Sequence, residues 1–184
     1  MPLRHLRDDH PDVTAEPEAT LDSLAELFAL LEQAGFQFWL AGGWAVDFHA
    51  GTVTRPHTDV DLVVHLADKD KLYALLLDVG FNVIDDSDPD AEMIYQRGNF
   101  KVDLSFIVEL DNGTVVSPGW EHWPWPPSAF SSGTQQLSGV SCHVVSASTL
   151  LTSKRDHETQ VGDEPRPRDL ADIRILESLV GRDH

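Results

Sequence analysis

Residues 40–47 read LAGGWAVD and residues 55–64 read RPHTDVDLVV, and the second of these blocks places Asp59 and Asp61 one residue apart. Side chains at positions i and i+2 of a strand point to the same face, with Cα atoms about 6.6 Å apart. Both carboxylates can therefore reach one hard cation. The alternating positions bury the opposite face: Val60, Leu62 and Val64. Because Mg²⁺ takes one or two protein carboxylates and completes its shell with water and substrate phosphates, the block predicts phosphate chemistry.

A glycine pair precedes this strand. Residues 36–40 are aromatic and apolar, which predicts a buried strand, and residues 44–50 are predicted to form a short helix closed by Gly51. Gly42 and Gly43 stand where the strand turns into the helix. Glycines at such a turn let backbone N–H groups approach phosphate oxygens, helped by the helix N-terminus. The pair does not form a G-x-G-x-x-G pattern, so a dinucleotide site gains no support.

A third carboxylate follows on a later strand. Gly98-Asn99 has the composition of a two-residue hairpin turn, so residues 92–97 and residues 100–109 are predicted to pair. Residues 100–109 alternate between apolar and polar side chains, and Asp103 falls on the polar face. This strand can neighbour the one that carries the carboxylate pair, which would bring three acidic side chains to one face of a sheet.

The remaining segments predict further helices and strands. Helices are expected at residues 20–34 with Thr20 as the cap, at 69–79 with Asp68 as the cap, at 146–157 with Ser146 as the cap, and at 168–180. Strands are expected at residues 81–85 and 140–145, with an acidic turn at 85–90. Composition then divides the chain into a flexible N-terminal tail at residues 1–19, a core at 20–145 and a C-terminal helical segment at 146–184.

Bulk composition narrows the range of functions. The chain has 184 residues and a formal net charge of -18, which opposes binding to nucleic acid, because such binding relies on Lys and Arg. The same charge steers cations toward the protein, whether metal ions or polyamine-like substrates. No stretch has the composition of a membrane span or a secretory signal, and the single cysteine, Cys142, fits a reducing compartment. We therefore expect a cytoplasmic protein without nucleic-acid or membrane partners.

The glycine pair, the Asp-x-Asp strand and the lone Asp103 together resemble the polymerase-β-like nucleotidyltransferases. Residues 39–64 are most similar to the aminoglycoside 2''-adenylyltransferases and the lincosamide nucleotidyltransferases, and looser similarity covers residues 100–107 and 146–176. The resemblance implies an α/β (α+β) fold, in which a mixed sheet flanked by helices is followed by a short C-terminal helical segment.

The resemblance also implies an activity. It predicts an enzyme that moves AMP from ATP, or from another NTP, to a hydroxyl of a small cationic or sugar-bearing acceptor. An aminoglycoside-type antibiotic is the expected acceptor, and a lincosamide or another small metabolite is the alternative. A homodimer is one arrangement in which such enzymes build their cleft.

Individual residues receive roles from the same resemblance. Asp59 and Asp61 are expected to hold Mg²⁺ at a two-metal site, because two metals about 3.5–4 Å apart can hold the attacking and the leaving oxygen. Asp103 either shares the second metal or acts as the general base on the acceptor hydroxyl. The expected nucleotide-binding residues are Gly42, Gly43, Trp44, Arg55 and Lys154. Lys154 shares its helix face with apolar residues, so it can reach from the core into a cleft.

Several residues keep a structural interpretation beside a functional one. His57 is either a hydrogen-bonded loop histidine or a phosphate contact, and Asp47 is expected to cap or orient its loop. Acidic and basic residues at 166–172 are expected to cap the last helix and form an ion pair. The Trp/Pro-rich loop at 120–127 forms either an acceptor-binding wall, in which Glu121 meets an ammonium group, or a small satellite core.

Two functions from other classes compete with the adenylyltransferase. A tRNA nucleotidyltransferase is disfavoured because this chain is short and strongly acidic. A non-catalytic module, such as the nucleotidyltransferase-like half of a toxin–antitoxin pair, would bind a helical partner without needing Asp59 or Asp61.

Overall fold

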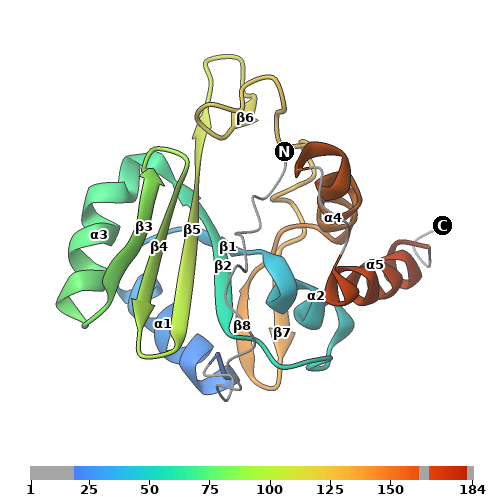
Figure 1. Ribbon diagram of the computed structural model, residues 1–184, viewed down its shortest axis with the longest axis horizontal. Coiled ribbons are helices and arrows are strands. Elements are labelled where there is room, and N and C mark those ends of the chain that lie inside the picture. The colour runs from blue at the N-terminus through green and yellow to red at the C-terminus, as the bar shows by residue number, and fades with distance from the viewer. Residues whose placement is uncertain (1–18, 162–165, 182–184) are drawn as a thin grey trace.

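The computed structural model describes residues 19–161 and 166–181, and Figure 1 shows how they are arranged. The helices are α1 (Leu21–Gln33), α2 (Gly42–Ala50), α3 (Lys69–Asp78), α4 (Ala147–Val161) and α5 (Pro167–Val180), with a short 3-10 turn at Leu66–Asp68. The strands are β1 (Phe38–Leu40), β2 (Asp59–His65), β3 (Asn82–Asp88), β4 (Glu92–Arg97), β5 (Phe100–Glu109), β6 (Val115–Val116), β7 (Thr134–Leu137) and β8 (Val140–His143). Apart from Ala19, the predicted tail lies outside the described residues.

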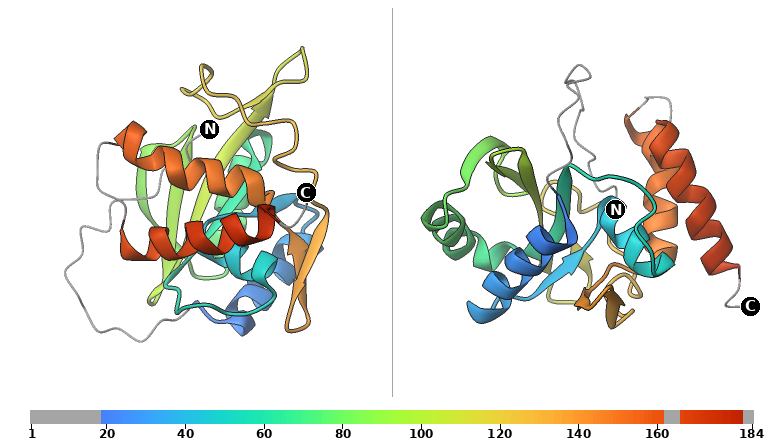
Figure 2. Two further views of the ribbon diagram at one scale, coloured as in Figure 1. Left: turned by 90° about the vertical axis from the view of Figure 1, so that its right-hand side faces the viewer. Right: turned by 90° about the horizontal axis from the view of Figure 1, so that it is seen from below.

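One mixed sheet organises the molecule. Its strands run in the order β1-β2-β5-β4-β3, with β6 added to β5, while β7 and β8 form a separate hairpin. Strands β2 and β5 are parallel, and the other pairings in the large sheet are antiparallel. Figures 1 and 2 show α3 beside β3 and β4, and α2, α4 and α5 together on the other side of the molecule. This arrangement confirms the predicted mixed sheet flanked by helices.

The strand registers follow from the sequence pattern. The predicted hairpin turn at Gly98-Asn99 is present, since Arg97 pairs with Phe100. The prediction that residues 100–109 neighbour the Asp-x-Asp strand is also correct, because every residue of β2 pairs with a residue of β5. In this pairing Asp61 lies directly opposite Asp103.

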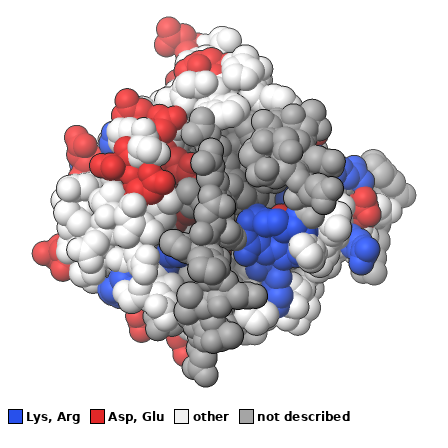
Figure 3. All heavy atoms as spheres, in the orientation of Figure 1, with Lys and Arg blue, Asp and Glu red and all other residues white. Residues whose placement is uncertain are grey.

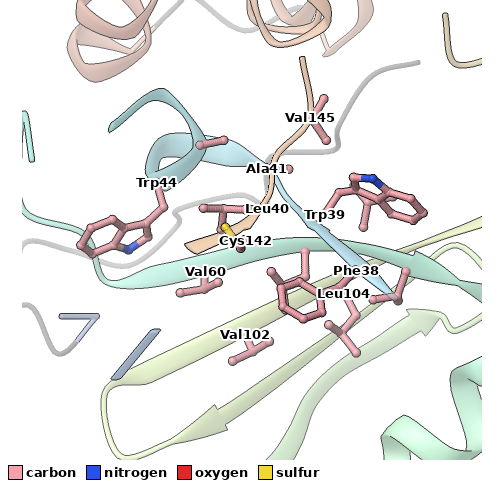
Figure 4. Packing of buried hydrophobic residues seen from close by; sticks show 14 of the residues in the cluster. Phe38, Trp39, Leu40, Ala41, Trp44, Val60, Val102, Leu104, Cys142 and Val145 are labelled. Carbon is pink, nitrogen blue, oxygen red and sulfur yellow. The ribbon is translucent and has the colours of Figure 1, made fainter. Parts of the chain in front are cut away.

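A continuous apolar core supports the sheet. Helix α1 packs an apolar stripe inward, with Leu24, Leu27, Phe28 and Leu31 buried, and the hydroxyl of Thr20, its predicted cap, accepts a hydrogen bond from the Ser23 N–H at 3.2 Å. Figure 4 shows residues of β1, β2 and β5 packed with Cys142 of β8, which is buried as expected for a small structural residue. Because one face of β2 is anchored in this core, its polar side chains are held on the opposite face.

Four local predictions were wrong in detail. Helix α2 begins at Gly42 rather than Trp44, which puts both glycines in its first turn. Asp68 makes no side-chain capping bond. The expected acidic turn is largely strand: β3 continues to Asp88, because an edge strand with irregular register tolerates charged residues. Strand β7 was not predicted, since its sequence, TQQL, has little apolar character.

The Trp/Pro-rich loop contains both a buried and a more exposed part. Trp125 is buried, and its ring lies 5.0 Å from that of Phe130, which in turn lies 4.7 Å from Trp39. Trp125 is thus structural, as one of the two interpretations held, but it belongs to the main apolar core rather than to a separate satellite core. Glu121 is exposed and accepts a hydrogen bond from the Gly119 N–H at 2.9 Å.

None of the helices in the described ranges combines the length and apolar composition needed to cross a membrane.

Candidate active site

Four acidic side chains lie on one face of three adjacent strands. Asp59 and Asp61 come from β2, Asp103 comes from β5, and Glu92 comes from β4. Glu92 pairs with Ser105, two residues beyond Asp103 on the same face, and it is one of the groups that raise the pKa of Asp103. We call these four residues the carboxylate face. The three carboxylates predicted from the sequence are thus on one surface, and Glu92 is an addition to them.

Crowding of like charges changes the acidity of this face. Burial raises the pKa of Asp61 to about 7, and the charge of Asp59 adds to the rise. Burial also raises the pKa of Asp103 well above its ordinary value, and Glu92 and Asp61 add to that rise. Both shifts have the same origin: acidic groups are held together away from water. A bound cation would relieve this cost.

The donor set of the carboxylate face fits a hard cation. All four side chains offer oxygen, and Asp103 is only 4% exposed. Its Oδ1 atom is buried and has no hydrogen-bond partner within the described part of the chain. In that same part, no three Asp, Glu, His or Cys side chains are arranged to enclose a metal by themselves. This combination suits Mg²⁺, which binds through one or two carboxylates and leaves positions for water and phosphate oxygens.

The two glycines of α2 make room for charged side chains. Gly42 has a φ of +61°, and a Cβ atom there would lie 1.7 Å from Oδ2 of Asp61. At Gly43 a Cβ atom would lie 2.1 Å from Nη2 of Arg55. The Ala41 N–H also donates to the Asp61 carbonyl at 2.8 Å, so α2 starts directly beside β2. The space over the glycines is therefore filled by Asp61 and Arg55, and contact of these two glycines with phosphates stays a prediction.

Gly42→Ala is expected to damage both stability and activity. Strain of this kind costs about 1–3 kcal/mol, and about 1 kcal/mol shifts Tm by about 2–4 °C in a domain of this size, so Tm should fall by about 2–12 °C. Displacement of Asp61 should also slow catalysis by about 10²-fold. Thermal unfolding and a transfer assay measure the two effects.

Gly51→Ala is the matched control for this substitution. Gly51 ends the same helix with a φ of +71°, but a Cβ atom there meets nothing within 4 Å. This variant should lose comparable stability and keep its activity. Equal activity in both variants would show that the contact between Gly42 and Asp61 does not matter.

Basic side chains lie next to the carboxylate face. Lys154 is buried on α4, as its helical spacing predicts, and its Nζ lies 2.9 Å from Asp172 and 3.4 Å from Asp169, both on α5. Arg55, from the loop before β2, contacts the same Asp172 at 3.3 Å. We call these four residues the cation cluster. Lys154 and Arg55 both lower the pKa of Asp61, which shows that they act on the carboxylate face.

Charges of opposite sign occupy different parts of the surface. On the face seen in Figure 3, Lys and Arg atoms gather near α2 and the start of α5, on the opposite side from the Asp and Glu atoms over β3 and β4.

Trp44, His57 and Asp47 support the loop that carries Arg55. The Trp44 ring stacks on His57 with centroids 4.4 Å apart, and His57 Nε2 lies 2.7 Å from Asp47. Asp47 also accepts a hydrogen bond from the Thr54 N–H at 3.1 Å, so it orients the loop as predicted. His57 is buried, which confirms its hydrogen-bonded interpretation. Trp44 is buried too, so its predicted role in nucleotide binding depends on the pocket that it helps to form.

That pocket lies between the start of α1 and the loop of residues 53–57. It has a volume of about 460 Å³, and Trp44, Arg55 and His57 are among its lining residues. Two of the residues predicted to bind nucleotide, Trp44 and Arg55, thus share one cavity, whereas its lining residues do not include Gly42, Gly43, Lys154 or the carboxylate face. The structure also brings Arg55 together with Lys154 through Asp172.

Comparison with known proteins identifies the family. Residues 23–176 match the model of the aminoglycoside-2''-adenylyltransferase family. The chain belongs to this family. The matched range extends from α1 into α5 and includes the carboxylate face and the cation cluster.

Single proteins with similar sequences match this chain over a shorter range than the family model does. A 2''-aminoglycoside nucleotidyltransferase of Klebsiella pneumoniae is 32% identical over 106 residues, which are 57% of this chain and 49% of that protein. A protein of the same name from Escherichia coli has the same identity and coverage. The chain thus aligns with about half the length of these curated relatives.

Solved structures share the fold. The lincomycin-bound lincosamide antibiotic adenylyltransferase LnuA has a TM-score of 0.73 and 22% identity, covering 87% of this chain and 98% of that one. ANT(2'')-Ia in complex with adenylyl-2''-tobramycin has a TM-score of 0.71 and 19% identity, covering 88% and 90%. At these identities the likeness concerns the fold, and it agrees with the predicted nucleotidyltransferase core.

The ion pair predicted at residues 166–172 is present between Arg166 and Asp169. Sequence reasoning missed Glu92 and the long-range contacts that Asp169 and Asp172 make with Lys154 and Arg55. The signal for Glu92 was available, because a turn at Gly98-Asn99 fixes Glu92 opposite Ser105 and hence beside Asp103. Asp169 and Asp172 are three residues apart and share a helix face. That spacing indicates a common partner but does not identify it.

The raised pKa of Asp61 predicts how pH would affect metal binding. An unfolded aspartate has a pKa of about 3.9, so between about pH 4 and 7 the metal-free folded protein holds a proton on Asp61 that the unfolded chain releases. The free energy of unfolding of the metal-free protein therefore falls as pH rises through this window. If Asp61 holds Mg²⁺ as the sequence predicts, the ion has to displace that proton, so its stabilising effect should be larger at high pH.

The expected difference can be measured by thermal unfolding with Mg²⁺ or EDTA. One pKa unit corresponds to about 1.4 kcal/mol, so the gain in Tm should be about 3–6 °C smaller at pH 6 than at pH 8. Asp61→Asn should remove this dependence. An equal gain at both pH values would contradict the assignment of Mg²⁺ to Asp61.

Proposed function

We propose that the protein transfers AMP from MgATP to a hydroxyl of an aminoglycoside-type antibiotic. The observation that carries this proposal is the pairing of Asp61 with Asp103 on one sheet face, with Lys154 and Arg55 beside them. An acidic face next to a cationic cluster suits a reaction that needs both a divalent cation and a bound polyphosphate. Membership of the family agrees with this chemistry.

Each residue then has a role in the donor half of the reaction. Asp59 and Asp61 would hold Mg²⁺, which neutralises charge on the phosphates and favours departure of pyrophosphate. Lys154 and Arg55 bind triphosphate oxygens, and the start of α2 at Gly42 lies next to the same position. Asp103 takes the proton of the acceptor hydroxyl, since its raised pKa makes it a stronger base than an ordinary carboxylate. Sharing a second metal is its alternative role.

The acceptor half rests on charge and on the relatives. The net charge of -18 attracts an amino sugar that carries several ammonium groups. The curated relatives are named for nucleotidyl transfer to aminoglycosides. A lincosamide is the second candidate, because the fold of LnuA covers most of this chain.

One assay tests the proposal. The protein is incubated with MgATP and panels of aminoglycosides and lincosamides, and mass spectrometry detects an adenylylated acceptor together with pyrophosphate. Product with an aminoglycoside is the expected result, and the Asp59→Ala/Asp61→Ala variant is the control. Metal-dependent ATP binding without product on any acceptor would contradict the proposed acceptors, and product from the control variant would overturn the metal assignment.

The organisation of the whole protein is also part of the proposal. We infer that the core at 20–145 and the helical segment at 146–184 act as one unit, because Lys154 of the second reaches the acidic face of the first. A requirement for ATP is consistent with action in the cytoplasm. Size-exclusion chromatography with and without MgATP tests the predicted homodimer.

A further inference from the structure

Helix α5 supplies two buried carboxylates to the basic side chains of the site. Asp169 and Asp172 are 3% and 1% exposed, and they lie one turn apart on the same helix face. Their partners come from distant parts of the chain: Lys154 belongs to α4, and Arg55 precedes β2. Ion pairs buried to this degree need several hydrogen bonds each, because removal from water is costly.

Asp172 is the centre of this arrangement. Its Oδ2 lies 2.9 Å from Lys154 Nζ and 3.3 Å from Arg55 Nη2, and its Oδ1 accepts from Arg55 Nε at 3.4 Å. A lysine and an arginine that share one carboxylate oxygen are held close together despite their mutual repulsion. Asp169 serves a different function, because it pairs most closely with Arg166, at 2.6 Å, and more weakly with Lys154.

Both cations keep donors that Asp172 does not use. Arg55 donates Nε and Nη2 to Asp172 and Nη1 to the Pro56 carbonyl, which accounts for three of its five N–H groups. Its side chain stays 23% exposed. Lys154 has three N–H donors, and Asp169 and Asp172 are the two carboxylates that the structure places against it. Together with Arg166, the two cations make three positive charges against the two carboxylates Asp169 and Asp172, so this network of ion pairs keeps one positive formal charge.

We infer that Asp172 is a positioning residue for the nucleotide donor. It holds Lys154 and Arg55 as a preformed pair that binds the triphosphate, an inference that rests on the proposed nucleotidyl transfer. Preformed cations lose less conformational entropy on binding than free side chains do. Asp172 does not itself need to touch the nucleotide.

The test compares nucleotide and acceptor constants in Asp172→Asn. This variant keeps the shape of the side chain and removes its charge, so Lys154 and Arg55 lose their common partner. We expect KM for MgATP and the Kd of MgATP, measured by calorimetry, to rise about tenfold or more. The KM of the acceptor should stay within about twofold, because Asp172 holds only the groups that bind the nucleotide. A defect in folding would instead affect the constants of both substrates.

Two further variants keep the result interpretable. Glu177→Gln is the matched control, because Glu177 forms an exposed ion pair with Arg155 between the same two helices, at 2.6 Å, and should change neither constant. Asp172→Glu retains the charge and moves it by one methylene group, so it should recover most of the MgATP affinity even if Asp172→Asn folds poorly. Thermal unfolding establishes which variants are folded.

The outcomes separate this inference from the proposed reaction. Unchanged MgATP affinity in folded Asp172→Asn would overturn the positioning role even if the wild-type protein adenylylates an acceptor. If Asp172→Asn does not fold, an Asp172→Glu variant that fails to bind MgATP while folded would overturn it as well. If the wild-type protein binds MgATP but forms no product, the reaction is wrong, and the same calorimetry still decides the role of Asp172.

Discussion

Asp61→Asn is expected to lower the rate of AMP transfer by about 10³-fold or more. Asp61 lies at the centre of the carboxylate face, opposite Asp103 and one residue from Asp59. The amide keeps the size of the side chain but removes the charge that would hold Mg²⁺. Metal ions contribute several kcal/mol to stabilising the charge of such a transition state, and about 1.4 kcal/mol corresponds to a tenfold change in rate. Steady-state kinetics with saturating MgATP and acceptor measure the effect.

A second readout connects the loss to the metal. Thermal unfolding should show that Mg²⁺ no longer raises the Tm of Asp61→Asn. Without metal, this variant should be at least as stable as the wild-type protein, because the substitution removes a buried contact between like charges. Asp86→Asn, on exposed β3, is the control for loss of one negative charge. Wild-type activity in Asp61→Asn would refute the proposed metal site.

Asp103→Asn is expected to lower kcat by about 10²- to 10⁴-fold, the usual contribution of a general base. The KM values for MgATP and acceptor should change much less. Because burial, Glu92 and Asp61 raise the pKa of Asp103, wild-type kcat should fall as pH drops below that raised value, since the base becomes protonated. The residual rate of the variant should lack this acidic limb. A pH profile of kcat for both proteins measures it.

The same variant distinguishes the two roles predicted for Asp103. If it is the base, Mg²⁺ should still raise the Tm of Asp103→Asn as in the wild-type protein. If it is a metal ligand, that gain should disappear together with activity. Asp111→Asn, in an exposed turn, is the control. Retention of the wild-type rate would exclude both roles.

Local periodicity explains how much of this site was predictable. Strand alternation places Asp59 and Asp61 on one face and Asp103 on the polar face of its own strand, and helical spacing turns Lys154 inward. The hairpin at Gly98-Asn99 also determined the position of Glu92, although that step requires the register as well as the strand. These predictions succeed because they depend on neighbouring residues and on burial of one face of each element.

Tertiary packing decided the rest. Asp172 reaches Arg55 across 117 positions of the chain, and no local pattern indicates that the last helix would lie against the loop before β2. The clearance above Gly42 and Gly43 likewise depends on how closely α2 packs against β2 and on where Arg55 turns. By itself, the sequence determined most of the strands and helices and the three aspartates of the acidic face, because backbone geometry repeats at short range. Only the folded structure decided which cations meet that face and what holds them there, because long-range ion pairs form when separate elements are buried together.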